Sequence, residues 1–132
     1  MPPRIHPDRP TPAELEVLQV LWRKGACTVR EVFEELGQGR ELGYTTILKL
    51  MQTMHSKGML VRDDSSRTHT YAARRSREDT RGAMTQEFLE RVFQGSTEQM
   101  MLSALGMKEG DAEQLKKLRA LLAEAKAKRG RR

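Results

Sequence analysis

The sequence predicts a mainly α-helical protein that carries one small β-hairpin. Two patterns lead to this fold class. Apolar residues recur at helical spacing in six segments, and between the third and the fourth segment the pattern changes to that of strands. With 132 residues, the chain has room for one domain or for two small domains that share a core.

The first two helices begin with the same motif. Thr11–Glu14 has the spacing of a capping box with proline at the first helical position, and Thr28–Glu31 repeats that box. Apolar residues then follow at helical intervals until a glycine ends each stripe. These signals predict one helix that ends at Gly25 and a second, about two and a half turns long, that ends at Gly37.

A third helix and a hairpin complete the first half of the chain. The apolar stripe predicts a helix from about Tyr44 to Lys57. Met59–Arg62 and Thr68–Ala72 are rich in Val, Thr and Tyr and flank a polar turn, which predicts a hairpin, and a third short strand is expected near Ala26–Thr28. Because three short helices followed by a hairpin is the element order of a winged helix-turn-helix, we expect that domain over residues 11–75.

Residues 76–125 return to the helical pattern and predict three further amphipathic helices. So short a segment is near the lower size limit for an independent core, so we expect it to complete its burial against a second copy of itself. Packing of these helices back onto the winged domain is the alternative. The side chains expected to form the dimer are Phe88, Val92, Met101, Leu105, Leu115, Leu118 and Leu122.

The charge of the chain favours an anionic partner, with nucleic acid first among the candidates. Lys and Arg number 24 against 18 Asp and Glu, which gives a net charge of +6 and a pI near 9.8. The excess lies in residues 40–75, with seven basic and three acidic side chains, and in residues 126–132, with five basic and none acidic. We interpret 126–132 as a solvated basic tail and 1–10 as a flexible N-terminus.

Catalytic and membrane functions find no support in the sequence. His6, His55 and His69 are dispersed without the spacing of metal ligands, and there is no phosphate-binding glycine loop or nucleophile elbow. The single cysteine, Cys27, is expected to be a buried apolar residue. The longest stretch without charge is the nine residues Gln99–Met107, against about 20 for a membrane span. We expect a cytoplasmic protein that is not an enzyme, needs no metal or other cofactor and does not insert into a membrane.

The predicted third helix has the composition of a DNA recognition helix. No Asp or Glu occurs from Tyr44 to Leu60, and a groove lined by phosphates repels carboxylates, while Gln pairs well with adenine and Lys with guanine. An ordinary solvated helix face is the alternative, although such a face usually carries some Glu or Asp. The candidate DNA contacts on this helix are Tyr44, Thr45, Thr46, Lys49, Gln52, Thr53 and Ser56.

The predicted hairpin adds cations beside that helix. Arg67 lies nearest the turn and is a candidate contact to the DNA backbone or minor groove; the other basic side chains are Arg62, His69 and Arg74. Asp63 and Asp64 lie among them, which suggests that one side of the hairpin faces DNA.

The order of these motifs resembles the BlaI/MecI penicillinase-repressor family. The resemblance rests on residues 13–22, 28–32 and 43–47, on Lys57-Gly58 and on a hairpin that carries Tyr71, and it covers about residues 11–122. It implies a winged-helix repressor of antibiotic-resistance or related operons that binds double-stranded operator dyads as a homodimer through its C-terminal helices.

The resemblance also implies how repression ends. A membrane sensor-transducer metalloprotease would trigger cleavage in the fifth helix, here near Ser103 and Ala104, where the Asn-Phe pair of the staphylococcal repressors is absent. Two other functions stay open from the residues alone. One is a winged-helix protein-interaction module, and the other is a regulator whose Met-rich C-terminal helices bind a small ligand directly.

Overall fold

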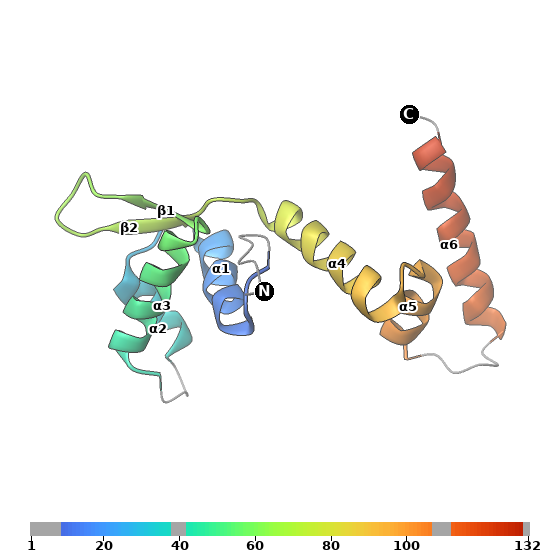
Figure 1. Ribbon diagram of the computed structural model, residues 1–132, viewed down its shortest axis with the longest axis horizontal. Coiled ribbons are helices and arrows are strands. Elements are labelled where there is room, and N and C mark those ends of the chain that lie inside the picture. The colour runs from blue at the N-terminus through green and yellow to red at the C-terminus, as the bar shows by residue number, and fades with distance from the viewer. Residues whose placement is uncertain (1–8, 38–41, 107–111, 131–132) are drawn as a thin grey trace, which may run out of the picture. The chain divides into compact units, whose positions relative to one another are not determined.

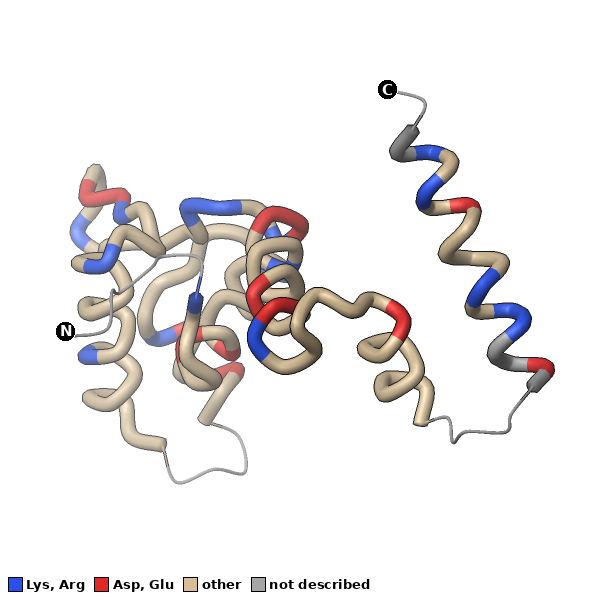
Figure 2. Tube along the Cα trace, turned by 45° about the vertical axis from the view of Figure 1, so that its right-hand side comes forward, with Lys and Arg blue, Asp and Glu red and all other residues tan. Residues whose placement is uncertain are grey.

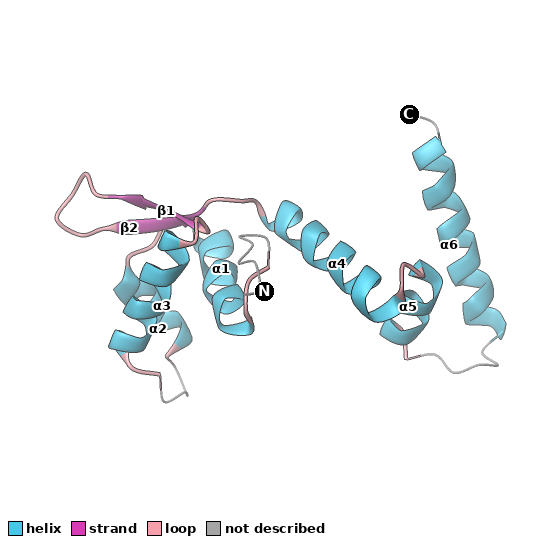
Figure 3. Ribbon diagram, in the orientation of Figure 1, coloured by secondary structure: helices cyan, strands magenta, loops and turns pink. Residues whose placement is uncertain are grey.

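The computed structural model describes residues 9–37, 42–106 and 112–130. Within these ranges the chain forms six helices and one two-stranded hairpin, so the predicted fold class is confirmed (Figures 1 and 3). None of the helices in the described ranges is long and apolar enough to span a membrane. In chain order the elements are α1 (Pro12–Lys24), α2 (Val29–Leu36), α3 (Tyr44–Ser56), β1 (Leu60–Asp63), β2 (Thr70–Ala73), α4 (Arg77–Phe93), α5 (Thr97–Ala104) and α6 (Ala112–Gly130).

The chain divides into two compact units, Met1–Met84 and Thr85–Arg132. The first turns of α4 belong to the first unit, so this division lies after the predicted domain boundary between residues 75 and 76. Thr80 in α4 is buried, and the indole Nε1 of Trp22 donates a hydrogen bond of 3.0 Å to the carbonyl of Arg75. These contacts hold the beginning of α4 to the domain that precedes it.

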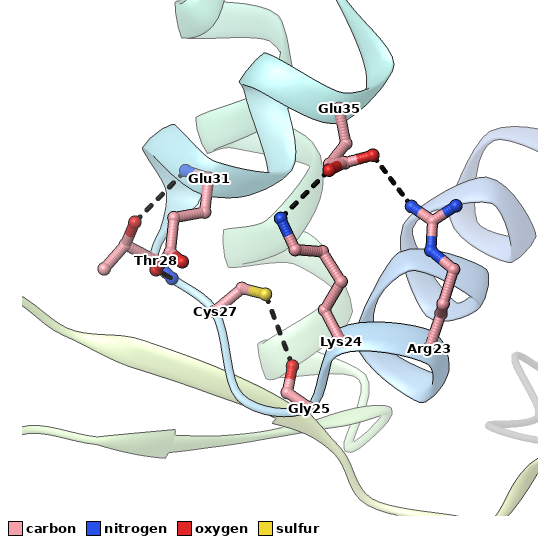
Figure 4. Close-up of polar contacts among 7 residues, drawn as sticks. All are labelled: Arg23, Lys24, Gly25, Cys27, Thr28, Glu31 and Glu35. Carbon is pink, nitrogen blue, oxygen red and sulfur yellow. Dashed lines mark hydrogen bonds and ion pairs between the residues drawn. The ribbon is translucent and has the colours of Figure 1, made fainter.

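Both predicted capping boxes form. In α1 the backbone N–H of Glu14 donates to the Thr11 hydroxyl at 3.2 Å, and the Glu14 carboxylate accepts from the Thr11 N–H at 2.9 Å. Thr28 and Glu31 make the same exchange at the start of α2, at 3.1 and 3.0 Å (Figure 4). Each box satisfies two backbone donors that a helix start leaves unpaired, which explains why both helices begin where the sequence predicts.

Two ion pairs also join the end of α1 to the end of α2. The Glu35 carboxylate binds Arg23 at 2.8 Å and Lys24 at 2.9 Å, and hydrogen bonds from Lys24 lower the pKa of Glu35 (Figure 4). The last turn of α1 is thus joined to the last turn of α2, and the angle between the first two helices is supported at the surface as well as in the core.

The hairpin is antiparallel and is joined to the turn after α1. β1 pairs with β2 in the register Leu60 to Ala73 and Asp63 to Thr70. Cys27 and Tyr71 exchange two backbone hydrogen bonds, of 3.0 and 2.8 Å, so the predicted third strand is a bridge of one residue. This bridge fixes the base of the hairpin against the helices.

One core holds the first unit together. Cys27 lies in it, 1% exposed, and burial raises the pKa of its thiol, in agreement with the predicted role of a small buried residue. Three of the methionines also fill this core. Its buried members are Val17, Leu18, Val20, Leu21, Cys27, Val29, Val32, Ile47, Met51, Met54, Met59, Leu60 and Tyr71.

The second unit contains the end of α4 with α5 and α6. The hydroxyl of Ser96 caps α5 by accepting from the N–H of Gln99 at 3.2 Å. The last helix continues to Gly130, so residues 126–130 of the predicted basic tail are helical, and residues 126–128 are exposed. Leu118 is buried within this unit, with 1% of its surface exposed.

Candidate nucleic-acid interface

Helix α3 presents two faces of opposite character. Ile47, Met51 and Met54 are buried and attach the helix to α1, α2 and β1. The residues predicted to contact DNA all lie on exposed positions of the same helix. Figure 2 shows no acidic residue along α3. Those exposed residues are Tyr44, Thr45, Thr46, Lys49, Gln52, Thr53 and Ser56.

The beginning of α3 is supported by α2. The rings of Tyr44 and Phe33 meet edge to face with centroids 5.8 Å apart, while 41% of Tyr44 remains exposed. Gly43 is the N-cap, makes no side-chain cap hydrogen bond, and is followed by no acidic residue in the first turn. The positive end of the α3 dipole is therefore not neutralised by a carboxylate of its own first turn.

Thr53 and Lys49, two of the predicted contact residues, differ in whether their side chains are free to donate a hydrogen bond to DNA. The Thr53 hydroxyl donates to the carbonyl of Lys49 at 2.9 Å, which leaves its oxygen as an acceptor and makes it a weaker candidate for a phosphate contact. The ammonium of Lys49 forms no ion pair within residues 9–37, 42–106 and 112–130, and it can therefore bind an incoming anion without breaking a contact inside the protein.

A buried ion pair anchors the other end of α3. The ammonium of Lys57, just after the helix, lies 2.6 Å from the carboxylate of Glu14, which is 2% exposed. Burial raises the pKa of Glu14, but hydrogen bonds from Lys57 and Thr11 more than offset this effect, and the net result is a lowered pKa. The pair connects the first turn of α1 to the end of α3, residues 43 positions apart, so it positions the exposed face of α3.

Both aspartates of the hairpin, Asp63 and Asp64, contact other residues of the hairpin. Arg62 Nε lies 2.8 Å and His69 Nδ1 2.6 Å from the same oxygen of Asp64. Asp63 accepts a hydrogen bond from the N–H of Ser65 at 2.9 Å, and hydrogen bonds with the side chain and the backbone of Ser65 lower the pKa of Asp63. Of the four basic side chains that the sequence assigns to the hairpin, Arg62 and His69 are therefore already occupied.

Arg67 and Arg74 are the remaining basic side chains of the hairpin. Both are exposed, and neither forms an ion pair or side-chain hydrogen bond with another described residue. Arg67 lies in the loop between the strands, and Arg74 follows β2. Arg67 therefore has the position and the freedom that its predicted role requires. Arg74 is equally free but lies at the base of the hairpin, where its N–H donates to the carbonyl of Met59. No group of three or more His, Cys, Asp or Glu in the described residues is placed to hold a metal ion.

The residues predicted to form a dimer fall into three groups. Phe88, Val92 and Leu105 are exposed, each by about half of its surface. Met101 and Leu122 are half-buried. Leu118 is buried within its own chain, so it is not available at the surface, and the side chain of Leu115 lies outside the described part of the structure.

Two features of the second unit bear on assembly and cleavage. Leu121, which is not among the predicted dimer residues, is 57% exposed. It is adjacent to Leu122 in α6 and adds an exposed apolar side chain to that helix. The predicted cleavage residues Ser103 and Ala104 are exposed and end α5.

Comparisons with known proteins agree with this arrangement. A family model described as penicillinase repressor matches residues 10–124. Transcriptional regulator BlaI of Mycobacterium tuberculosis (strain H37Rv) is 32% identical over 124 residues, which are 90% of this chain and 86% of the relative. The penicillinase repressor of Bacillus licheniformis is 27% identical over 114 residues, 86% of this chain and 89% of the relative.

A solved structure resembles part of the chain. The solution structure of the DNA binding domain of the repressor BlaI has a TM-score of 0.50 and 25% sequence identity, and the match covers 58% of this chain and 93% of that one. The winged helix-turn-helix and the match to the family model thus lead to the same assignment. The chain belongs to the penicillinase repressor family, the family that its motifs resemble, and as a member of a family of transcriptional repressors it is not an enzyme.

Proposed function

We propose that this protein is a sequence-specific DNA-binding repressor that acts as a homodimer on an inverted-repeat operator. The observation that carries the proposal is the face of α3, which is exposed, free of carboxylates and rich in groups that donate to phosphates or base edges. A helix inserted in the major groove needs this combination, because every acidic side chain on it would face phosphates. In this arrangement Lys49 and Gln52 read bases, and Tyr44, Thr45, Thr46 and Ser56 contact base edges or the backbone.

The hairpin supplies the contacts that do not depend on sequence. Arg67 and Arg74 are exposed and unpaired among the described side chains, and an arginine beside a recognition helix binds the phosphate backbone or the minor groove. Their role in this proposal is to hold the register of α3 on the duplex.

The second unit supplies the dimer. Exposed apolar side chains on α4, α5 and α6 support an interface, since isolated surface helices do not normally expose this much apolar surface without a partner. A two-fold dimer requires an inverted repeat whose half-sites lie about 10 to 10.5 bp, or a multiple of that, apart. The interface is assigned to Phe88, Val92, Met101, Leu105, Leu121 and Leu122.

Release of repression is assigned to a membrane sensor-transducer metalloprotease. The proposal is supported by family membership and by the exposure of Ser103 and Ala104 at the end of α5, where a protease can reach the backbone. Cleavage there separates α6 from the remainder of the chain and removes part of the dimer interface.

Footprinting on the DNA upstream of its own gene tests the proposed function. The purified protein is expected to protect two symmetric half-sites, and light scattering of the free protein is expected to give the mass of a dimer. A protein-interaction module would instead show weak binding without a defined footprint. Protection that disappears on addition of a small molecule alone would favour direct ligand sensing over proteolytic release.

A further inference from the structure

Asp64 contacts two basic side chains of the hairpin, Arg62 and His69, so not all of the basic side chains of the hairpin are unpaired. Arg62, in β1, forms an ion pair with Asp64, and His69, at the other end of the loop, contacts the same carboxylate oxygen. All three side chains are partly exposed, with 35%, 49% and 52% of Arg62, Asp64 and His69 accessible. The cluster is thus at the surface, where a DNA phosphate could take the place of the carboxylate.

Arg62 is held by more than one bond. Hydrogen bonds to the side chains of Tyr71 and Asp64 raise the pKa of its guanidinium, and Tyr71 is itself buried and fixed by the bridge to Cys27. A phosphate that approached Arg62 would meet the negative charge of Asp64, which lies 2.8 Å from the Nε of Arg62, and like charges repel each other.

We propose that Asp64 is a specificity-determining residue that limits sequence-independent DNA binding by withholding Arg62 from the phosphate backbone. Every phosphate contact strengthens binding to all sequences equally, so a repressor with one more free cation on the hairpin would bind random DNA more tightly without reading its operator better. This inference rests on the proposed function, because it assumes that the hairpin lies against DNA.

The adjacent aspartate provides a matched control. Asp63→Asn and Asp64→Asn remove the same charge one residue apart, and asparagine at 63 keeps the oxygen that accepts from Ser65. Only the Asp64 variant weakens a pair that holds a cation, because charge-assisted hydrogen bonds are stronger than neutral ones. A difference between the two variants therefore reports on the release of Arg62 and not on net charge.

The test is a salt titration of binding to a duplex of random sequence. One additional phosphate contact steepens the slope of log K against log salt by about 0.9, so over a fourfold rise in salt Asp64→Asn should lose roughly three- to four-fold more affinity than the wild type. Asp63→Asn should show a smaller change. The double variant Asp64→Asn with Arg62→Ala should return to the wild-type slope.

Three results would overturn the inference or its basis. Equal slopes for Asp63→Asn and Asp64→Asn would show that net charge alone acts. A slope gain that survives in the double variant would show that Arg62 is not the released cation. A wild-type protein that fails to bind DNA at all would overturn the proposed function as well, and that outcome is visible before any variant is compared.

Discussion

Replacing Glu14 with glutamine removes the charge from the buried pair that anchors the end of α3. Removal of one partner of a buried ion pair costs about 3 to 5 kcal/mol because it leaves the other charge uncompensated. Lys57 is 22% exposed and can regain part of its hydration, and glutamine keeps an oxygen for the Thr11 cap. We therefore expect the free energy of unfolding to fall by about 2 to 3 kcal/mol.

Urea unfolding followed by tryptophan fluorescence measures this loss. Trp22 is the one tryptophan of the chain and lies in the first unit, so its signal reports on the domain that contains the pair. The control is Glu34→Gln, which breaks an exposed pair with Arg30 at 3.5 Å and should cost less than about 0.5 kcal/mol.

The effect of Glu14→Gln should depend on pH in a defined direction. The folded state lowers the pKa of Glu14 below its ordinary value of 4.5, so the pair stabilises the protein fully above about pH 4.5 and loses its contribution as the pH falls through the folded-state value. The difference between wild type and variant should therefore shrink in acid. A loss below about 0.5 kcal/mol at pH 7, or a difference that stays constant into acid, would show that the Glu14–Lys57 pair does not stabilise the fold.

Three further changes test other parts of the account. Arg67→Ala should weaken binding to all DNA sequences and reduce the salt slope by about 0.9; an unchanged slope would exclude Arg67 from the interface. Leu121→Glu should convert the dimer to a monomer in light scattering without loss of fold, because Leu121 is exposed, whereas an intact dimer would place the interface elsewhere. Because burial raises the pKa of the Cys27 thiol, Ellman's reagent should label it only after unfolding; rapid labelling of the folded protein would contradict its placement.

Features that depend on neighbouring residues could be predicted from the sequence. Both capping boxes form because an N-cap needs only residues three positions apart. The exposed face of α3 follows in the same way, since a helical stripe of Ile47, Met51 and Met54 fixes which side chains point outward. The fold class and the α3 residues of the candidate interface therefore required no knowledge of tertiary structure.

Features that depend on distant or competing contacts could not be predicted from the sequence. The sequence presented Glu14 as part of a cap, and its second partner, Lys57, lies 43 residues away. Arg62 and His69 looked like DNA contacts until the fold placed both on Asp64. Leu118 fits the apolar spacing of a dimer seam, yet packing inside its own chain already buries it. In each case a contact set by tertiary structure decided which role the residue has.

The base preference of α3 variants shows whether α3 is the recognition helix. Selection of bound sequences from a random DNA pool, repeated with Lys49→Ala and with Gln52→Ala, shows which base pairs each side chain reads. Each variant should lose preference at its own position in both half-sites, with a cost of about 1 to 3 kcal/mol for the preferred base. Selection of the same sequences with the same affinity by both variants would contradict the assignment of α3 as the recognition helix.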